Sequence, residues 1–398
     1  MKKTWVKIPE VLSFQEGPGV RNTQYTEEGV KLLNVANLVN GKVDLSTSDR
    51  YISEKEAYGK YKHFLCDDGD FIIASSGIKV EYIDKKMGFV DETMLPLCMN
   101  TSTIRFKVLD ENILRIRYFM YYLKSHHFKE QLFRQITGSA QLNYGPSHLG
   151  KMIMPLIDLA NQDEIINYLD RINHIINARQ QQLQKLDELV KARFVEMFGD
   201  PVQNPLKWVT KTLLEMGYCK NGVNFHSGDS GIEIHCLGVG DFKDYSVVDG
   251  TDYLPTISLS EEPPEESMLQ DGDIVFVRSN GNKALVGRCL VVYPHNTPTT
   301  YSGFCIRYRL TSDEVNTSYL LRVLKADSMR KKMIGHGANI QNLNQKTLAT
   351  LNIPIPPMEL QEQFAEFVNQ TDKSKVAVQK ALDEAQLLFD SLMQKYFG

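Results

Sequence analysis

The stretch Gln162–Gly199 reads QDEIINYLDRINHIINARQQQLQKLDELVKARFVEMFG and contains neither proline nor internal glycine. Eight of ten positions taken at alternating steps of four and three are apolar, which is the seam of a coiled-coil helix and not the alternation of a strand. These ten positions are Ile165, Leu169, Ile172, Ile176, Arg179, Leu183, Leu186, Val190, Arg193 and Met197. At roughly 1.5 Å per residue the helix would be about 55 Å long, and Gly199 and Pro201 predict where it ends.

The same pattern returns 199 positions later without a gap. Gln361 aligns with Gln162, and the Phe-Gly pair that ends the first helix returns as Phe397-Gly398. The second seam runs through Phe364, Val368, Thr371, Lys375, Val378, Leu382, Ala385, Phe389, Leu392 and Tyr396. The chain is therefore predicted to be a tandem duplication, in which each half is a globular segment followed by one long helix.

Composition sets limits on the class of protein. A chain of 398 residues favours two domains over a single core. The formal net charge of -4 is close to neutral, and the six cysteines show no CxxC spacing, so we interpret them as reduced core residues of a cytosolic protein. No apolar run approaches the ~20 residues of a membrane span, and no signal peptide is recognisable, so we expect a cytoplasmic protein that does not enter a membrane.

Turn and strand patterns place the segment boundaries at 1–157, 158–199, 200–357 and 358–398. In the first globular segment we expect a strand over Val30–Leu38, an Asp68-Gly69-Asp70 turn that feeds the strand Phe71–Ala74, a strand over Thr103–Val108 and a helix over Ile116–Gln135. A polar loop precedes the apolar run Met152-Ile153-Met154-Pro155.

The second globular segment repeats this order. Asp271-Gly272-Asp273 leads into an apolar strand, a helix is expected over Ser318–Met333, and a polar loop precedes Ile353-Pro354-Ile355-Pro356. The predicted fold class is α+β, with two homologous globular domains and two long helices. Two copies of one unit usually relate by a twofold axis, which favours antiparallel helices with one domain at each end.

Motifs for catalysis are absent or incomplete. Residues 145–151 fit the first seven positions of a phosphate-binding loop, but Met152 stands where the magnesium-binding Ser or Thr should be. His126-His127 and the His235-Cys236 pair lack a second pair at zinc spacing. No serine-hydrolase elbow, nuclease carboxylate cluster or base-flipping methyltransferase motif was found, so the sequence predicts neither a catalytic residue nor a metal site.

Residue types that contact DNA gather at corresponding places in the two segments. Cations on helices suit phosphate contacts, while Arg can read guanine and Asn or Gln can read adenine. The candidate DNA-binding residues are Ser76, Lys79, Lys124, Lys129, Arg134, Gln141, Asn143, Arg278, Asn280, Asn282, Lys283, Lys325, Arg330, Lys331, Lys332, Gln341, Asn342 and Asn344. Solvated helix faces and ordinary loops are the competing interpretation of the same residues.

Taken together, the chain resembles the specificity subunits of type I restriction–modification systems along its whole length. The resemblance rests on the two Asp-Gly-Asp turns, the polar loops before the apolar runs, and the order of motifs occurring twice. Gln162-Asp-Glu-Ile and Gln361-Glu-Gln-Phe at the helix starts also match that family, as does Phe198-Gly199-Asp200-Pro201.

The resemblance implies a non-catalytic subunit that recognises double-stranded DNA. Each domain would read one half of a bipartite, asymmetric site, with the antiparallel helices as the spacer. Two modification subunits would bind S-adenosylmethionine and methylate adenine, and restriction subunits would bind ATP and Mg²⁺, so no cofactor is expected on this chain.

Two other functions stay open on the sequence alone. One is a stand-alone DNA nuclease or methyltransferase with a cryptic site, and the other is a purely structural coiled-coil scaffold. The polar seam positions Arg179, Arg193, Thr371 and Lys375 also have two explanations, because they could fix the register of the helices or be covered by a partner subunit.

Overall fold

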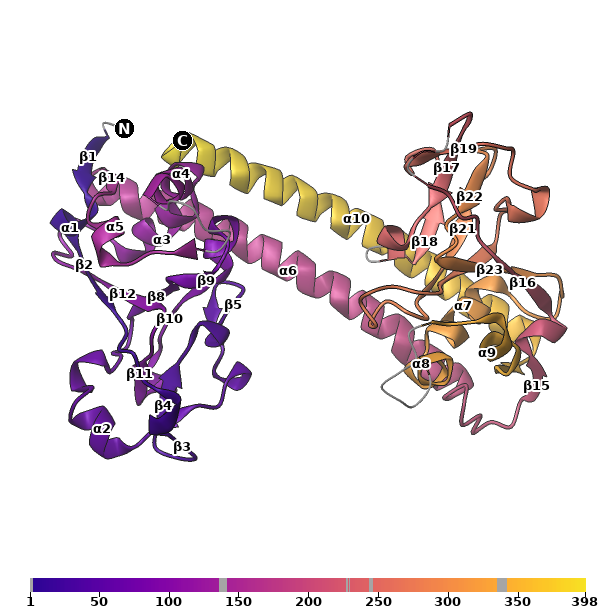
Figure 1. Ribbon diagram of the computed structural model, residues 1–398, viewed down its shortest axis with the longest axis horizontal. Coiled ribbons are helices and arrows are strands. Elements are labelled where there is room, and N and C mark those ends of the chain that lie inside the picture. The colour runs from indigo at the N-terminus through magenta and orange to yellow at the C-terminus, as the bar shows by residue number, and fades with distance from the viewer. Residues whose placement is uncertain (1–2, 136–141, 227, 229, 243–245, 335–341) are drawn as a thin grey trace. The chain divides into compact units, whose positions relative to one another are not determined.

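The computed structural model describes residues 3–398 apart from 136–141, 227, 229, 243–245 and 335–341. The chain divides into two compact units (Figure 1). Unit 1 comprises Met1–Gln180 and Lys380–Gly398, and unit 2 comprises Gln181–Gln379. No helix in the described ranges has the length and apolar character needed to cross a membrane.

Unit 1 is a mixed α and β domain. Its helices are α1 (Ile8–Val11), α2 (Glu54–Tyr58), α3 (Ile116–Lys124), α4 (His126–Gln135), α5 (Pro146–Leu149), the first half of α6 (Leu159–Phe198) and the end of α10 (Met358–Phe397). Its strands are β1 (Thr4–Lys7), β2 (Leu12–Glu16), β3 (Tyr25–Thr26), β4 (Val30–Leu33), β5 (Leu38–Val39), β6 (Lys42–Val43), β7 (Tyr51–Ile52), β8 (Phe71–Ala74), β9 (Ser76–Ile78), β10 (Met87–Phe89), β11 (Leu97–Met99), β12 (Thr103–Val108), β13 (Leu142–Asn143) and β14 (Ile153–Leu156).

Unit 2 has the same kinds of element in a corresponding order. Its helices are the second half of α6, α7 (Thr317–Lys325), α8 (Asp327–Ile334), α9 (Gln345–Ala349) and the first half of α10 (Met358–Phe397). Its strands are β15 (Val209–Thr212), β16 (Gly217–Asn221), β17 (Ile232–Leu237), β18 (Val247–Asp249), β19 (Thr256–Leu259), β20 (Asp273–Val277), β21 (Cys289–Tyr293), β22 (Thr299–Tyr301), β23 (Cys305–Leu310) and β24 (Asn352–Ile355).

The sheets confirm that the two units share one topology. The order β10-β8-β12-β2 in unit 1 corresponds to β21-β20-β23-β16 in unit 2, where β18 adds a fifth strand. Each unit also pairs two strands in parallel, with Leu32 opposite Cys98 in one and Cys236 opposite Thr300 in the other. The predicted α+β class and the predicted duplication are both confirmed.

The two Asp-Gly-Asp turns adopt the same conformation. Gly69 and Gly272 have φ angles of +81° and +87°, which disfavour any residue with a side chain. Asp70 is buried beside the Arg105 guanidinium at 3.0 Å, and Asp273 is buried beside Arg309 at 2.8 Å. Each turn therefore starts its central strand, β8 or β20, from a fixed position.

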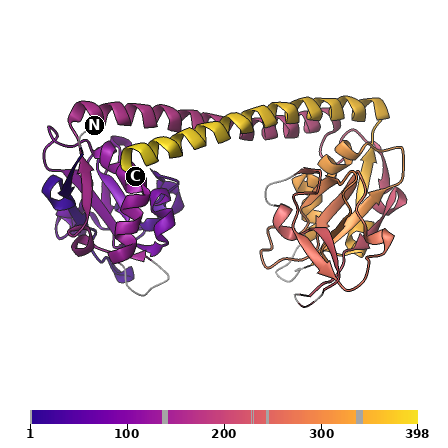
Figure 2. The same ribbon diagram turned by 90° about the horizontal axis from the view of Figure 1, so that it is seen from above.

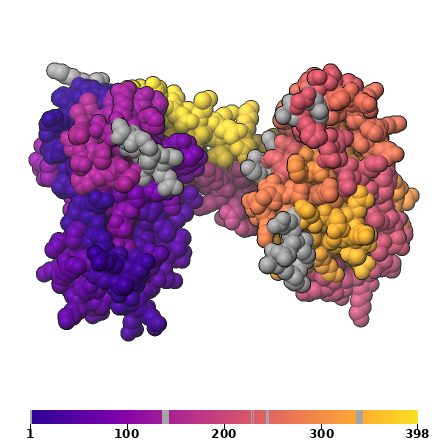
Figure 3. Space-filling model, viewed as in Figure 1, coloured from indigo at the N-terminus to yellow at the C-terminus, as the bar shows by residue number. Residues whose placement is uncertain are grey.

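The predicted long helices are confirmed, and each is unbroken along its length (Figure 2). In unit 1 the start of α6 and the end of α10 share one core, which includes Leu169 and Phe397. In unit 2 the end of α6 meets the start of α10, where the Phe194 and Phe364 rings lie 5.5 Å apart. The helices therefore run antiparallel, as predicted. One side of the C-terminal half of α10 is exposed, and its surface is yellow in Figure 3.

Two of the polar seam positions are occupied by ion pairs. Lys375 Nζ lies 2.7 Å from a carboxylate oxygen of Asp187 on the facing helix. Arg193 pairs instead with Glu196 of its own helix at 2.8 Å. The Lys375–Asp187 pair therefore favours the explanation that polar seam residues fix the register of the helices, because an ion pair across the seam opposes slippage of one helix along the other.

A buried glutamine ties each long helix to its globular domain. The Gln162 side chain accepts a hydrogen bond from Arg115 N at 2.9 Å and donates to the carbonyl oxygens of Ile113 and Ile157 at 2.9 and 2.8 Å. Gln361 makes the same three bonds, with Asn316 N, Glu314 O and Pro356 O. Both glutamines are fully buried. We call this arrangement the glutamine lock.

The structure corrects both predicted recognition-domain helices, because each is interrupted. Helix α3 stops at Lys124 and α4 begins at His126, since the Ser125 hydroxyl accepts a hydrogen bond from Phe128 N at 3.2 Å and so caps a new helix. In unit 2, Ala326 with extended backbone (ψ 138°) separates α7 from α8. Single helices over Ile116–Gln135 and Ser318–Met333 were therefore wrong.

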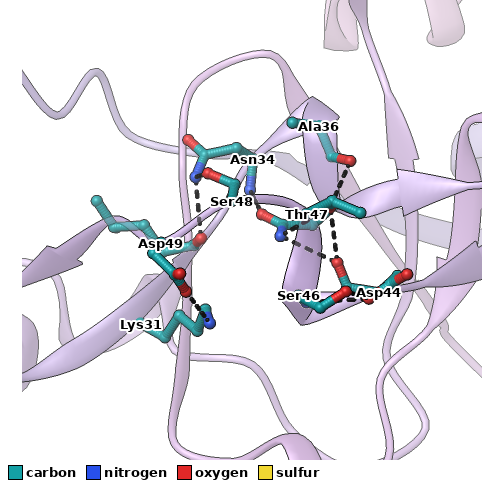
Figure 4. Close-up of polar contacts among 10 residues, drawn as sticks. Lys31, Asn34, Ala36, Asp44, Ser46, Thr47, Ser48 and Asp49 are labelled. Atoms are coloured by element: carbon teal, nitrogen blue, oxygen red, sulfur yellow. Dashed lines mark hydrogen bonds and ion pairs between the residues drawn. The ribbon is translucent and has the colours of Figure 1, made fainter. Parts of the chain in front are cut away.

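The predicted strand Val30–Leu38 is also interrupted. Strand β4 ends at Leu33, and residues 35–37 form a single 3₁₀ turn before β5. The cause is a polar network, and Figure 4 shows the part of it around Asn34, Thr47 and Asp44. Asn34 N donates to Asn37 Oδ1 at 2.9 Å, while Asn37 Nδ2 donates to Asp44 O at 3.1 Å. These side chains satisfy backbone groups that a continuous strand would have paired with its neighbours.

Candidate nucleic-acid interface

In unit 1, the loop after the central strand lies beside the polar loop that precedes the long helix. Strand β9 pairs with β13, which sets Ser76 opposite Asn143. Ser75 fixes this arrangement, because its N–H donates to Ser102 O at 2.8 Å and its carbonyl accepts from Tyr144 N at 3.0 Å. The two predicted contact regions are therefore joined through the backbone. We call them the strand-end loop (residues 75–79) and the polar loop (described from residue 142).

Unit 2 repeats this arrangement with different side chains. Arg278 N donates to Phe304 O at 2.8 Å, and Leu343 N donates to Arg278 O at 2.7 Å. A bridge sets Ser279 opposite Asn342. The strand-end loop of unit 2 (residues 278–283) and its polar loop (described from residue 342) therefore form one continuous surface.

A hollow lies between these two loops of unit 2. Its volume is about 520 Å³, and it is lined by Val239, Ser279, Asn280, Gly281, Lys283, Phe304 and Asn342. Three of these, Asn280, Lys283 and Asn342, are predicted DNA-binding residues. Sequence reasoning missed Phe304, whose side chain is 64% exposed. An exposed aromatic beside two amides and a cation has the chemistry to bind a base edge and a phosphate.

Other candidates in unit 2 also make hydrogen bonds within or beside the loops. Arg278 Nη1 donates to Gly303 O at 3.3 Å, and the Asn280 and Asn282 side-chain oxygens accept hydrogen bonds from backbone N–H groups within the loop. Asn344 caps helix α9, because its side-chain oxygen accepts from Thr347 N at 2.8 Å. In unit 1, Lys79 and Asn143 are exposed and Ser76 is half-buried. Gln141 and Gln341 lie outside the described residues.

One pair of predicted phosphate contacts has the same internal role in both units. Lys129 Nζ donates to Glu81 O at 3.1 Å and lies 3.0 Å from an Asp84 carboxylate oxygen. Arg330, at the matching position of α8, donates to Ala284 O. Glu81 and Ala284 follow the strand-end loops at matching positions. Each cation therefore ties its helix to the end of a strand-end loop.

The remaining cations fall into two groups. Desolvation lowers the pKa of both Lys124 and Lys325, and Lys325 also donates to the Ser246 hydroxyl at 2.5 Å. Arg134, Lys331 and Lys332 are exposed. Their role as phosphate contacts stays a prediction, and the exposed group is the better placed of the two to make them.

This difference gives a prediction about salt. Replacing Lys331 with alanine should flatten the dependence of log K on log salt by roughly one unit, because one counterion fewer is released per contact. Replacing Arg330 with methionine should keep most of the slope and instead reduce discrimination between DNA sequences, because the loop is no longer tied to α8. Binding titrations at several salt concentrations measure both effects. An unchanged slope for Lys331→Ala would show that Lys331 does not contact a phosphate.

The other sequence candidates lie in ordinary structural surroundings. Burial raises the pKa of the Cys66 and Cys236 thiols to about 12. The His127 ring lies 4.7 Å from the Trp5 ring, and α5 occupies the positions of the phosphate-loop match. Within the described ranges, no three His, Cys, Asp or Glu side chains are grouped to hold a metal ion.

Comparison with known proteins gives one consistent result. The family described as "Type I restriction modification DNA specificity domain" matches residues 3–188 and 243–385. The type I restriction enzyme StySPI specificity subunit of Salmonella potsdam is 23% identical over 394 residues, covering 93% of this chain and 82% of that protein. The EcoKI specificity subunit of Escherichia coli K12 is 22% identical over 392 residues, with the same coverage.

Two solved structures have a similar fold. One is the crystal structure of the type I restriction–modification S subunit from M. genitalium, with a TM-score of 0.56 and 17% identity, covering 100% of this chain and 96% of that one. The second comes from work on complex assembly and conformational transition of the type I system, with a TM-score of 0.55 and 17% identity over 99% and 97% of the two chains. At this identity the likeness supports the fold alone.

Proposed function

The chain belongs to the type I restriction modification DNA specificity family, and on this premise we propose that it is the non-catalytic DNA-recognition subunit of a type I restriction–modification complex. Each unit reads one half of a bipartite double-stranded DNA site. The site is asymmetric because the two units carry different residues at matching positions.

One observation carries this proposal. Both units join a strand-end loop to a polar loop by the same backbone bonds, yet the buried Ser75 in one corresponds to the half-buried Arg278 in the other. A shared scaffold with different side chains at matching positions is what two readers of different sequences require. Sequence is read by side chains that reach base edges, whereas backbone positions can stay constant.

The antiparallel helices α6 and α10 serve as the spacer between the half-sites, and they also bind the partners. Leu189 and Leu388, which are 199 positions apart, are 49% and 51% exposed. Two matching exposed leucines suit two copies of one modification subunit. Those subunits supply S-adenosylmethionine and the methyl transfer to adenine, and restriction subunits supply ATP-driven cleavage with Mg²⁺. This chain binds none of these cofactors.

The test uses the complex of this chain with its modification subunits. Native mass spectrometry should find two modification subunits per chain, and mapping of N6-methyladenine in genomic DNA should find one bipartite, asymmetric site. The isolated chain should bind neither S-adenosylmethionine nor ATP. Cofactor binding by the isolated chain would support the stand-alone enzyme instead, and methylation without a bipartite site would overturn the proposal.

The variant Arg278→Ala sharpens this test. We expect this variant to lose about 1–3 kcal/mol of discrimination against wrong bases at one base pair of the half-site that unit 2 reads, which is the usual contribution of a bidentate base contact. The half-site of unit 1 is the internal control, because no residue of that unit is changed. Loss of preference at both half-sites together would indicate a folding defect or a different architecture.

A further inference from the structure

Phe304 lies at the surface of unit 2, and its side chain is 64% exposed. The residue lines the hollow of unit 2 together with Asn280, Lys283 and Asn342. An apolar ring thus stands among polar groups at the place where the two loops meet.

The backbone holds Phe304 in place. Its carbonyl accepts hydrogen bonds from Arg278 N at 2.8 Å and Ser279 N at 3.3 Å. The preceding Gly303 N donates to Val223 O at 2.6 Å. These backbone bonds carry the ring on a fixed support.

The aromatic ring does not belong to the scaffold that the two units share. In unit 1 the carbonyl that receives the matching bond, from Ser75 N, belongs to Ser102. The Ser102 hydroxyl accepts a hydrogen bond from the Ser76 hydroxyl at 2.6 Å. The position that accepts this bond therefore carries a small polar residue in unit 1, where Ser102 has a φ of 66°, and an exposed ring in unit 2.

The combination of groups selects one kind of base pair. In the major groove, thymine alone presents a methyl group, which apolar side chains contact, and its partner adenine presents the N6 and N7 edge that asparagine binds. A G·C pair offers no methyl group. Asn342 is the better amide for the adenine, because the Asn280 oxygen already accepts from Asn282 N at 2.8 Å.

We propose that the hollow of unit 2 reads one A·T pair, with the Phe304 ring against the thymine methyl and the Asn342 amide on the adenine edge. This assignment rests on the proposed function of the chain as a DNA reader. Lys283, on the rim of the same hollow, is suited to a neighbouring phosphate.

The experiment removes the methyl group from the DNA and the ring from the protein. Once the half-sites have been mapped, duplexes are made with uracil in place of each thymine of the half-site of unit 2. The wild-type complex should lose about fourfold in affinity at one thymine, the worth of one buried methyl group. Phe304→Ala should bind the thymine and uracil duplexes equally, whereas Phe304→Leu should keep part of the difference.

A matched control is Phe133→Ala, since Phe133 is 70% exposed in unit 1 and should leave the uracil effect in place. Equal binding of thymine and uracil duplexes by the wild-type complex at every position would overturn the assignment, as would a half-site of unit 2 without an A·T pair. Either result leaves the bipartite site, and hence the proposed function, intact. Absence of any bipartite site would contradict both the A·T assignment and the proposed function. If the Phe304→Ala complex is inactive, the binding of thymine and uracil duplexes by the wild-type complex still decides the test.

Discussion

Replacing Gln361 with leucine should lower the free energy of unfolding of unit 2 by about 2–5 kcal/mol. Leucine fills a similar volume but leaves Asn316 N, Glu314 O and Pro356 O without their partner. Each buried polar group left unpaired costs about 1–3 kcal/mol, part of which relaxation recovers. The effect should be large because the lock joins the start of α10 to two segments of the domain.

The measurement needs a signal that belongs to unit 2 alone. The chain contains two tryptophans, Trp5 and Trp208, so a Trp5→Phe background leaves Trp208 to report denaturant unfolding of unit 2. Gln363→Leu is the matched control, because Gln363 is exposed on the same helix and should change stability by no more than about 0.5 kcal/mol. Equal effects of the two substitutions would show that the lock does not stabilise the unit.

Lengthening both long helices by seven residues should move the two half-sites apart. Seven residues inserted after Gln182 and after Ala381 keep the seam in register and lengthen each helix by about 10 Å. This corresponds to roughly three base-pair steps at about 3.4 Å each. The complex should then methylate the same two half-sites with about three more unread base pairs between them.

Mapping of N6-methyladenine measures the spacing directly. The control is a variant with the insertion in only one helix, which shifts the register of the two helices at the Lys375–Asp187 pair. Domains that move along DNA also rotate around it, so loss of activity in the double-insertion complex would not by itself reveal the spacing. The single insertion should lower the stability of the helix pair. An active double-insertion complex that keeps the original spacing would show that these helices do not set the gap.

Patterns that repeat over many residues were predictable from the sequence. The seam of Gln162–Gly199 and its return 199 positions later predicted both long helices, the duplication and the antiparallel arrangement. Each of these features depends on the combined contribution of many side chains. The interruptions at Ser125 and Ala326 were not predicted, because one capping bond decides the first and one extended residue the second. Ser125 did carry a signal, since serine is a preferred residue at a helix start.

The candidate interface shows the same division. Loop positions could be matched between the halves, and three of the predicted residues line the hollow of unit 2. The internal role of Lys129 and Arg330 could not be foreseen, because each reaches a carbonyl about 46–48 positions away in sequence. Phe304 was missed because its place at the surface depends on backbone bonds from Arg278 and Ser279, which are distant in sequence and leave no periodic pattern.

Unit 1 is built from two pieces of chain that are far apart in sequence, and this affects the order in which the protein is made. Its core includes Met393, Tyr396 and Phe397, which the ribosome adds after every residue of unit 2. Domains usually fold in the order of their synthesis, from the N-terminus onward. Here the second unit has its complete sequence first, while the first unit waits with part of its apolar surface uncovered. A nascent chain that stops short of Lys380 would thus carry a complete unit 2 and an unfinished unit 1, which exposes prematurely ended products to the cell's proteases and chaperones.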